Sequence, residues 1–174
     1  SGTIAQDKQF LSIGNKTYNL LGGNDYQSTG GDGYKADLGK LVTAYGLFSN
    51  KDEVEVDFLI MGPGCAEEAQ SQAKANYIIS LANARKDCMA FISPYRDGVV
   101  NVSSAATQLQ NVLSFFSPLT SSSYAVFDSG YQYVYDRFNQ QFVYMPCSAD
   151  VAGLCARTDI DQFPWYSPAG KSRG

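Results

Sequence analysis

Hydrophobic positions along the chain follow first helical and then alternating spacing. The segment from Lys35 predicts a helix that ends near Asn50 and Lys51. Its helically spaced apolar residues are Leu38, Leu41, Val42, Tyr45 and Phe48. Alternating apolar residues over 53–62 predict a strand whose second half is apolar on both faces. Such a strand is typical of a buried sheet.

The following segments repeat the order of helix and strand. Residues 65–85 predict a helix with small side chains that allow close packing on a sheet. Its expected buried stripe is Ala66, Ala69, Ala73, Tyr77, Leu81 and Ala84. Residues 87–93 and 123–130 predict two more strands, and Ser103 or Ser104 is expected to cap a helix between them that ends before Pro118. That helix carries the apolar residues Ala106, Leu109, Leu113 and Phe116.

Strands and helices that alternate in this way predict an α/β fold. Right-handed connections between the strands would give a mostly parallel sheet with helices on both faces. A final helix is expected over 148–157, with Ser148 as its cap and Asp150 favourably placed in its first turn.

Between the last strand and the final helix lies an aromatic segment. Residues 131–146 predict a β-hairpin around the turn RFNQQ. The tyrosines at 131, 133 and 135 share one face, where we expect them to pack across the strands against Phe142 and Tyr144.

The first 34 residues differ from the rest because they are rich in glycine and polar residues. They predict a lead-in with short strands, a hairpin turn at Gly14 and Asn15, and then a loop. Asp25 and Asp32 lie in this loop, but their spacing does not match a calcium-binding EF-hand loop. We therefore expect a lead-in over residues 1–34 and one α/β domain over residues 35–174.

Composition narrows the class of protein. A chain of 174 residues with 44% hydrophobic residues is large enough for one domain with a core. The net charge of −4 and the lack of a Lys/Arg run disfavour nucleic-acid binding. No apolar run has the length of a membrane span. Neither a nucleic acid nor a membrane is therefore an expected partner.

The chain contains no histidine, which excludes the usual Ser-His-Asp and Cys-His catalytic arrangements. Its four cysteines show no C-x-x-C pair, and Cys147 and Cys155 would lie about 12 Å apart along one helix, too far for a disulfide. We expect reduced, buried cysteines, an intracellular place of assembly, no cofactor, no metal site and no enzymatic activity.

Two motifs still carry candidate chemistry. In FLIMGPGCAEEA, Gly62 and Gly64 fit the first two positions of a G-x-G-x-x-G phosphate-binding turn, but Glu67 replaces the third glycine. A structural turn is expected, and a nucleotide- or dinucleotide-binding enzyme remains the alternative. Arg96 and Asp97 follow a strand, where they would form a ligand site, a surface ion pair or an intersubunit contact.

The segments DVAGLCARTD and PWYSPAGKSRG resemble a strongly marked region of the contractile tail sheath proteins of T-even-like bacteriophages, which are myoviruses. EVDFLIMGPGC, NARKDCMAFISPYRD and YAVFDSGYQYVYDRFNQQFVYMP are similar to the same family in the same order. The resemblance is close from about Val54 to Gly174, and it covers the residues that predict the α/β domain.

The resemblance implies a structural protein of the virion. Sheath subunits of this family form hexameric rings stacked around a tail tube, and the sheath contracts when the baseplate triggers it. Contraction drives the tube through the host envelope for genome delivery. The expected partners are other sheath copies, the tail tube protein and the baseplate, and assembly is expected in the host bacterial cytoplasm. A small surface-binding module with one heterologous partner is a further possibility.

The resemblance also implies a position within a longer protein. The matched region is the family's central sheath domain, which is likened to the subtilisin fold without its catalytic residues. We expect Gly174 to be a cut before a C-terminal domain. The candidate packing or intersubunit contacts are Arg157, Asp159, Trp165, Tyr166, Lys171 and Arg173.

Overall fold

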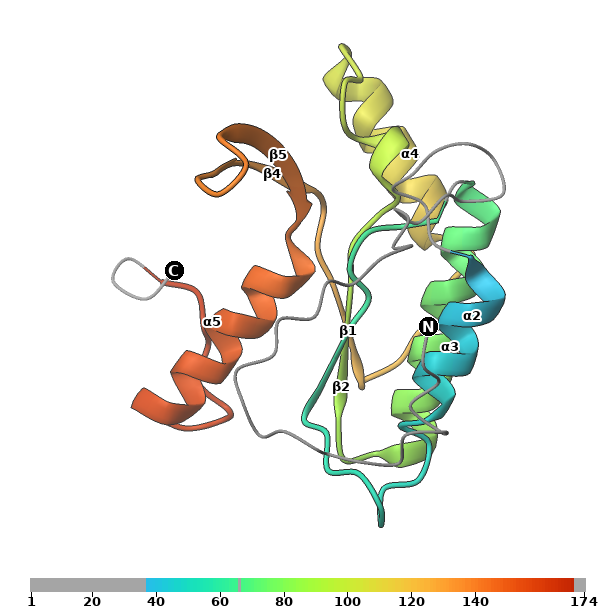
Figure 1. Ribbon diagram of the computed structural model, residues 1–174, viewed down its shortest axis with the longest axis vertical. Coiled ribbons are helices and arrows are strands. Elements are labelled where there is room, and N and C mark those ends of the chain that lie inside the picture. The colour runs from blue at the N-terminus through green and yellow to red at the C-terminus, as the bar shows by residue number, and fades with distance from the viewer. Residues whose placement is uncertain (1–36, 66, 171–174) are drawn as a thin grey trace, which may run out of the picture.

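The computed structural model describes residues 37–65 and 67–170. In this part of the chain a three-stranded parallel sheet lies between helices, and a two-stranded antiparallel hairpin extends from it (Figure 1). The lead-in expected over residues 1–34, with its turn at Gly14, lies outside the described residues.

The elements follow the order that the hydrophobic pattern predicts. They are α2 (Leu38–Gly46), β1 (Phe58–Ile60), α3 (Glu68–Arg85), β2 (Met89–Ile92), the short 3-10 helix η1 (Arg96–Gly98), α4 (Ala105–Phe116), β3 (Ala125–Phe127), β4 (Tyr131–Asp136), β5 (Gln141–Pro146) and α5 (Ser148–Asp161). The sheet order is β1-β2-β3 with parallel pairing throughout, which confirms the α/β class. The strand expected over 53–62 pairs only at Phe58–Ile60.

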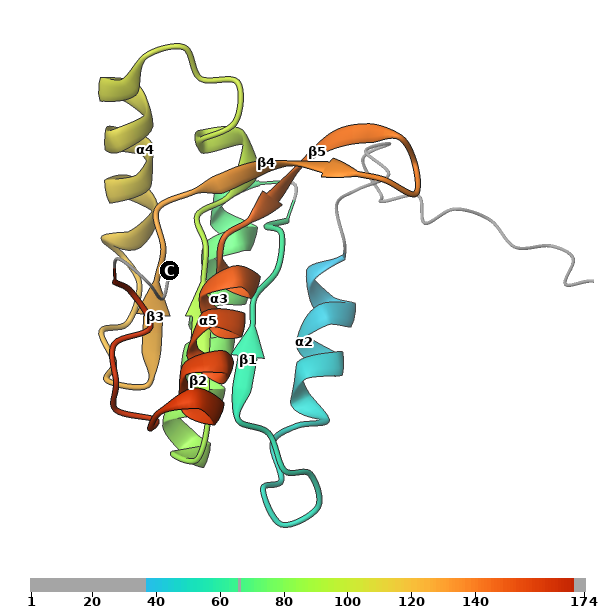
Figure 2. The same cartoon turned by 90° about the vertical axis from the view of Figure 1, so that its left-hand side faces the viewer.

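Helices cover both faces of the sheet. Because the three strands lie side by side in chain order, right-handed connections place α3 and α4 on the same face. Helix α5 packs against β1 and β2 from the opposite face (Figure 1, Figure 2). The hairpin β4–β5 leaves the end of the sheet and arches away from it (Figure 2).

The core lies mainly between the sheet and the pair α3 and α4. Its buried members are Leu59, Met61, Ala75, Ile78, Ile79, Leu81, Ala82, Cys88, Ala90, Ile92, Phe115 and Leu119. On the other face, the buried residues of α5 are the small side chains Ser148, Ala152 and Thr158. The main buried cluster therefore lies on one side of the sheet, and Phe91, which is 1% exposed and alternates with Ala90 and Ile92, packs on the other side.

The stripe predicted for α3 is wrong by about one position. Ala69, Ala73 and Ala84 are exposed, and only Leu81 of the expected stripe is buried among the described residues. The buried face also contains the polar residues Ser71, Lys74 and Arg85. Hydropathy assigns such residues to the solvent side, but here hydrogen bonds to backbone groups satisfy them.

The ends of α4 and α5 show one confirmed cap and one correction. Ser104 is the N-cap of α4, where its hydroxyl accepts a hydrogen bond from the Thr107 amide at 3.3 Å. Ser148 is the first residue of α5 instead of its cap, and Cys147 occupies the cap position. Helix α5 also continues to Asp161, beyond the expected end at 157, and Asp150 lies in its first turn as predicted.

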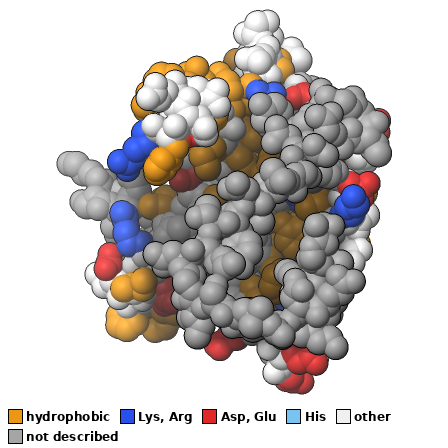
Figure 3. Space-filling view, in the orientation of Figure 1, with side chains coloured by type: hydrophobic (Ala, Val, Ile, Leu, Met, Phe, Trp, Pro, Cys, Tyr) orange, Lys and Arg blue, Asp and Glu red, His pale blue; other side chains and the backbone are white. Residues whose placement is uncertain are grey.

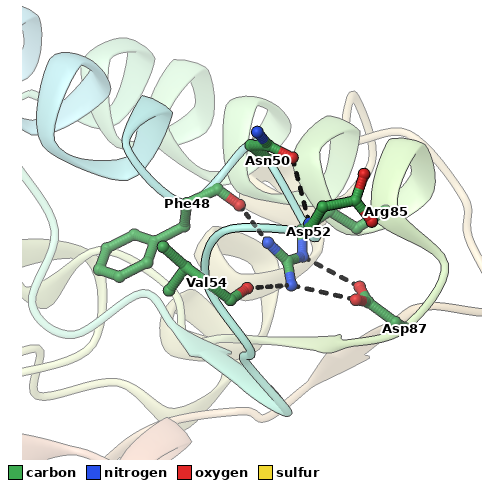
Figure 4. A network of polar contacts seen from close by, with 6 residues as sticks. All are labelled: Phe48, Asn50, Asp52, Val54, Arg85 and Asp87. Carbon is green, nitrogen blue, oxygen red and sulfur yellow. Dashed lines mark hydrogen bonds and ion pairs between the residues drawn. The ribbon is translucent and has the colours of Figure 1, made fainter.

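Arg85, at the end of α3, contacts and stabilises the connection between α2 and β1 (Figure 4). Its side chain is 1% exposed. The guanidinium donates to the carbonyl oxygens of Phe48 and Val54 and forms an ion pair with Asp87 at 2.9 Å. The hydrogen bonds from Arg85 also hold the pKa of the Asp87 carboxyl below its usual value.

Candidate functional site

The glycine turn between β1 and α3 is closed by side chains of α3. Gly62 has a φ of 64°, a left-handed conformation that glycine adopts at low cost. Lys74 Nζ donates to the Pro63 carbonyl at 2.9 Å, and Ser71 Oγ accepts from the Cys65 amide at 2.9 Å. The Lys74 ammonium and the Cys65 amide are two groups suited to phosphate binding. Both already form hydrogen bonds within the chain.

Gly64 is required for close packing at this turn. A Cβ at this position would lie 3.1 Å from Tyr95 Cβ and 3.2 Å from Tyr95 Cα. Burial also lowers the pKa of Lys74 and raises the pKa of the Cys65 thiol. These features support the interpretation of the segment as a structural turn.

A polar cluster joins α5 to the sheet, and we call its members Ser93, Asp128 and Ser148 the α5 joint. The two serines are fully buried and Asp128 is partly buried. Ser93 Oγ donates to Asp128 Oδ2 at 2.6 Å and accepts from the Ser148 amide at 3.0 Å. Ser93 and Asp128 follow β2 and β3, at the carboxyl edge where ligands bind in α/β sheets. Burial raises the pKa of the Asp128 carboxyl despite its hydrogen bonds from Ser93 and Gly130.

The joint is suited to holding a helix and not to acid–base catalysis. Ser93 Oγ is engaged both as donor and as acceptor, and the chain has no histidine to activate it. The hydroxyl of Ser148 is buried and has no hydrogen-bond partner among the described residues. Burial raises the pKa of Tyr131 to about 12, so this phenol is neutral at ordinary pH.

The hairpin carries an exposed aromatic surface, which we call the hairpin face and define as Tyr133, Tyr135, Phe142 and Tyr144. Tyr133 pairs with Tyr144 and Tyr135 with Phe142, which confirms the predicted cross-strand packing for these two tyrosines, whereas Tyr131 pairs with Pro146. The Tyr133 ring lies 4.9 Å from Phe142 and 4.6 Å from Tyr144. All four side chains are exposed, and hydrophobic side chains gather around the hairpin at the upper left of Figure 3.

A second aromatic surface follows the end of α5, and we call Phe163 and Trp165 the tail cluster. Their rings stack with centroids 4.8 Å apart, and Trp165 is 77% exposed. Tyr166 lies beside them, 6.5 Å from the Phe163 ring.

Four of the candidate contact residues expected from the sequence lie on α5 or in the segment that follows it, namely Arg157, Asp159, Trp165 and Tyr166. Arg157 and Asp159 are exposed on α5, in the helix that leads to Trp165. Lys171 and Arg173 lie outside the described residues.

Sequence reasoning missed the α5 joint and the exposure of the hairpin face. The joint left a signal, because Ser93 and Asp128 each come directly after a strand of the parallel sheet. No sequence signal indicates that the hairpin face is exposed, since side chains that pack across the strands of a two-stranded ribbon can still be open to solvent.

The other candidates have simple structural roles. Arg96 and Asp97 form a half-exposed ion pair at 3.4 Å, which is one of the three roles expected from the sequence. All four cysteines are free, with Cys65 and Cys88 buried and the other two partly buried. Within residues 37–65 and 67–170, no three metal-ligating side chains come together, and no helix is long and apolar enough to cross a membrane.

Curated relatives match most of this chain. It is 37% identical over 146 residues to the tail sheath protein of Enterobacteria phage T4, which covers 78% of this chain and 22% of that protein. It is 34% identical over 174 residues to the tail sheath protein of Vibrio phage KVP40, with 90% and 24% covered. The tail sheath protein of Salmonella phage ViI is 34% identical over 111 residues, covering 63% of this chain and 17% of that protein. No family model matches the sequence. The chain spans less than a quarter of the length of these relatives.

Proposed function

Because this chain is a segment of the tail sheath protein family of T4-like bacteriophages, we propose that the longer protein polymerises as hexameric rings around a tail tube. The family assigns it a structural role in the virion. The sequence relation over most of the chain is the observation that carries this proposal.

The mechanism we propose is mechanical. Free energy would be stored in the difference between an extended and a contracted packing of the subunits, and its release would drive the tube through the host envelope for genome delivery. No covalent substrate is turned over in this mechanism. Two observations support a non-enzymatic role. The sequence has no histidine, and the Ser93 hydroxyl already donates one hydrogen bond and accepts another within the chain.

We further propose that residues 35–174 form the central sheath domain, with the subtilisin-like arrangement but without its catalytic residues. The parallel sheet with helices on both faces is compatible with this assignment. Residues 1–34 would be a lead-in to that domain. Assembly would take place in the host bacterial cytoplasm.

The proposed partners are other copies of the sheath protein, the tail tube protein and the baseplate. The exposure of Arg157, Asp159 and Trp165 supports their proposed role as contacts within the longer protein or between its copies. Tyr166, Lys171 and Arg173 belong to the same proposal.

Negative-stain electron microscopy of the longer protein, expressed alone at high concentration, tests the proposal. Hollow tubes or stacked rings are the expected result. Dispersed monomers at every concentration and salt would contradict a sheath role. The alternative of a nucleotide-binding enzyme gains no support from the turn at Gly62, because Lys74 and the Cys65 amide bond within the chain.

A further inference from the structure

Helix α5 receives no side-chain cap from the residue before it. Cys147 occupies the cap position, but it has a right-handed helical conformation (φ −70°, ψ −14°) and its side chain makes no cap hydrogen bond. By contrast, Asp37 and Ser104 cap α2 and α4 from the usual extended conformation, each by accepting a hydrogen bond from a first-turn amide. Helix α3 lacks such a cap as well, but eight of its residues are buried, against three in α5. The start of α5 therefore depends on groups from elsewhere in the chain.

The residues of α5 also give it little helical stability of its own. Its 14 residues are close to the length below which isolated helices are marginal in water. Gly153 lies in its interior, and glycine is the weakest helix former after proline. Its last turn contains Asp159 and Asp161 and no basic residue, which opposes the helix dipole. We therefore expect α5 to be helical mainly because it packs on the sheet.

The end of the sheet supplies the missing cap. Ser93 directly follows β2, and its hydroxyl oxygen accepts a hydrogen bond at 3.0 Å from the amide of Ser148, the first residue of α5. This amide is one of the four at a helix start that find no partner within the helix. Ser93 is completely buried and lies 55 residues earlier in the chain, so the bond exists only while α5 is docked on the sheet.

Asp128 positions the Ser93 hydroxyl for this role. The hydroxyl donates to Asp128 Oδ2 at 2.6 Å, a distance typical of a hydroxyl bonded to a carboxylate. Because an ionised carboxylate only accepts hydrogen bonds, the hydroxyl proton points to Asp128 and the oxygen lone pairs remain for the Ser148 amide. Asp128 Oδ1 also accepts from the Gly130 amide at 3.1 Å, and the Gly130 carbonyl accepts from the Cys147 amide at 3.1 Å. One carboxylate thus organises the acceptors of two amides at the start of α5.

We propose that Ser93, positioned by Asp128, caps α5 from the end of the sheet, and that α5 is helical only while it is docked. Docking and helix formation are then one step. Arg157 and Asp159, two candidate contacts of the longer protein, lie on this helix and are held in place only in the docked state. The coupling belongs to a single copy, whether or not the longer protein polymerises.

Thiol labelling of the longer protein tests this coupling. Thr158→Cys places a thiol of similar size on the buried face of α5, and Cys88 in the core is the internal reference, because both positions are 5% exposed. Iodoacetamide reaches a buried thiol through an open state, so the labelling rate follows the population of that state when reclosing is fast. Peptide mass spectrometry measures each thiol separately, at a protein concentration below that of assembly.

Ser93→Ala should increase the labelling rate of the thiol introduced by Thr158→Cys. The expected increase is roughly 2–30-fold, the factor that corresponds to the loss of a helix cap. The rate at Cys88 should not change. Ser104→Ala is the matched control, because it removes the local cap of α4 and should leave both rates as they are.

Gly153→Ala tests the coupling with the α5 joint intact, and it decides the question even if Ser93→Ala prevents folding. The change favours the helix and adds a methyl group where nothing lies within 4 Å. If α5 unfolds when it leaves the sheet, the rate at position 158 should fall by about 2–5-fold, because only the docked state gains from a better helix former. If α5 leaves the sheet as an intact helix, the rate should stay the same and the proposal is wrong.

Two results with Ser93→Ala would also overturn the proposal. Equal acceleration of both thiols would show that Ser93 supports the whole core and not α5 in particular. An unchanged rate at position 158 would show that the bond from the Ser148 amide does not hold the helix. Neither result bears on the sheath role, which electron microscopy tests separately.

Discussion

Single buried polar side chains on α3 hold two loops beside the sheet, the turn between β1 and α3 and the connection between α2 and β1. Ser71 bonds the turn before its own helix, Lys74 bonds the Pro63 carbonyl, and Arg85 bonds the connection that follows α2. Burying a polar group is unfavourable unless it is hydrogen-bonded, so each of these side chains constrains the backbone that it contacts.

Ser71→Ala should destabilise the fold although alanine suits a helix. The change removes the acceptor of the Cys65 amide and the donor to the Glu67 carbonyl in a residue that is completely buried. An unsatisfied buried group costs about 1–3 kcal/mol, so we expect a loss of this size in the free energy of unfolding, measured with urea. Ser80→Ala, at an exposed position of the same helix, should change it by less than about 0.5 kcal/mol. Equal effects of the two substitutions would contradict this assignment.

Asp128 should make stability depend on pH with a definite sign. Because burial raises its pKa in the folded state, its favourable contribution is complete below the unfolded pKa of about 3.9 and is lost as the pH rises through the folded value. Asp128→Asn removes this loss. The variant should therefore gain free energy of unfolding relative to the native chain between about pH 4 and about pH 7 in denaturant titrations. A difference that stays constant over this range would show that the carboxyl does not titrate differently on folding.

At the scale of elements, α5 contacts the sheet through small side chains. Ala152 is 2% exposed in the middle of this contact, while neighbouring Gly153 has open space around it. Close approach of the helix to the sheet therefore depends on small side chains at the buried positions of α5, of which Ala152 is one.

Ala152→Leu should overfill the contact between α5 and the sheet. We expect a loss of about 1–3 kcal/mol in the free energy of unfolding, measured by thermal or urea denaturation. Gly153→Ala is the matched control, because it adds a methyl group where nothing lies within 4 Å of the new Cβ. It should stabilise the helix by about 0.5–1 kcal/mol. Stabilisation by both substitutions would show that α5 is not packed closely at Ala152.

The order of elements could be predicted from hydrophobic spacing, but the faces of the helices could not. The error in α3 arose because Ser71, Lys74 and Arg85 are polar by type and buried through hydrogen bonds that depend on the folded loops. In α4, Leu109 and Leu113 look like core residues, yet they are 60% and 53% exposed in this segment. The spacing of apolar residues indicates which side chains share one face of a helix. Whether that face is buried depends on the elements that pack against it.

The candidate surfaces show the same limit. Trp165 and Tyr166 were identifiable because they lie in a segment that resembles the sheath family. The α5 joint was not identified, because its members come from three distant positions that only the parallel sheet brings together.

At the scale of the whole molecule, the polar groups of the glycine turn face inward while aromatic surfaces face outward. The Cys65 amide and Lys74 are bonded internally, whereas the hairpin face and the tail cluster are exposed. This distribution does not favour a nucleotide site at the glycine turn.

Nucleotides should therefore leave the thermal stability of the chain unchanged. A ligand that binds the folded state at 100 times its Kd would stabilise it by about 2.7 kcal/mol. We expect no shift in Tm with ATP, GTP or NAD at millimolar concentration in differential scanning fluorimetry. A reproducible rise in Tm that Lys74→Met abolishes would revive the nucleotide-binding alternative.

The concentration of the core on one face of the sheet has a consequence for how the molecule opens. Amide hydrogens of α3 and β2 should exchange with deuterium only through global unfolding, because large buried side chains surround them. Those of α5 should exchange together at lower free energy, through partial opening that detaches the helix from an intact sheet. Assembly would slow exchange selectively in α5 and the hairpin, so the least protected unit of the isolated chain would become ordered by its neighbours.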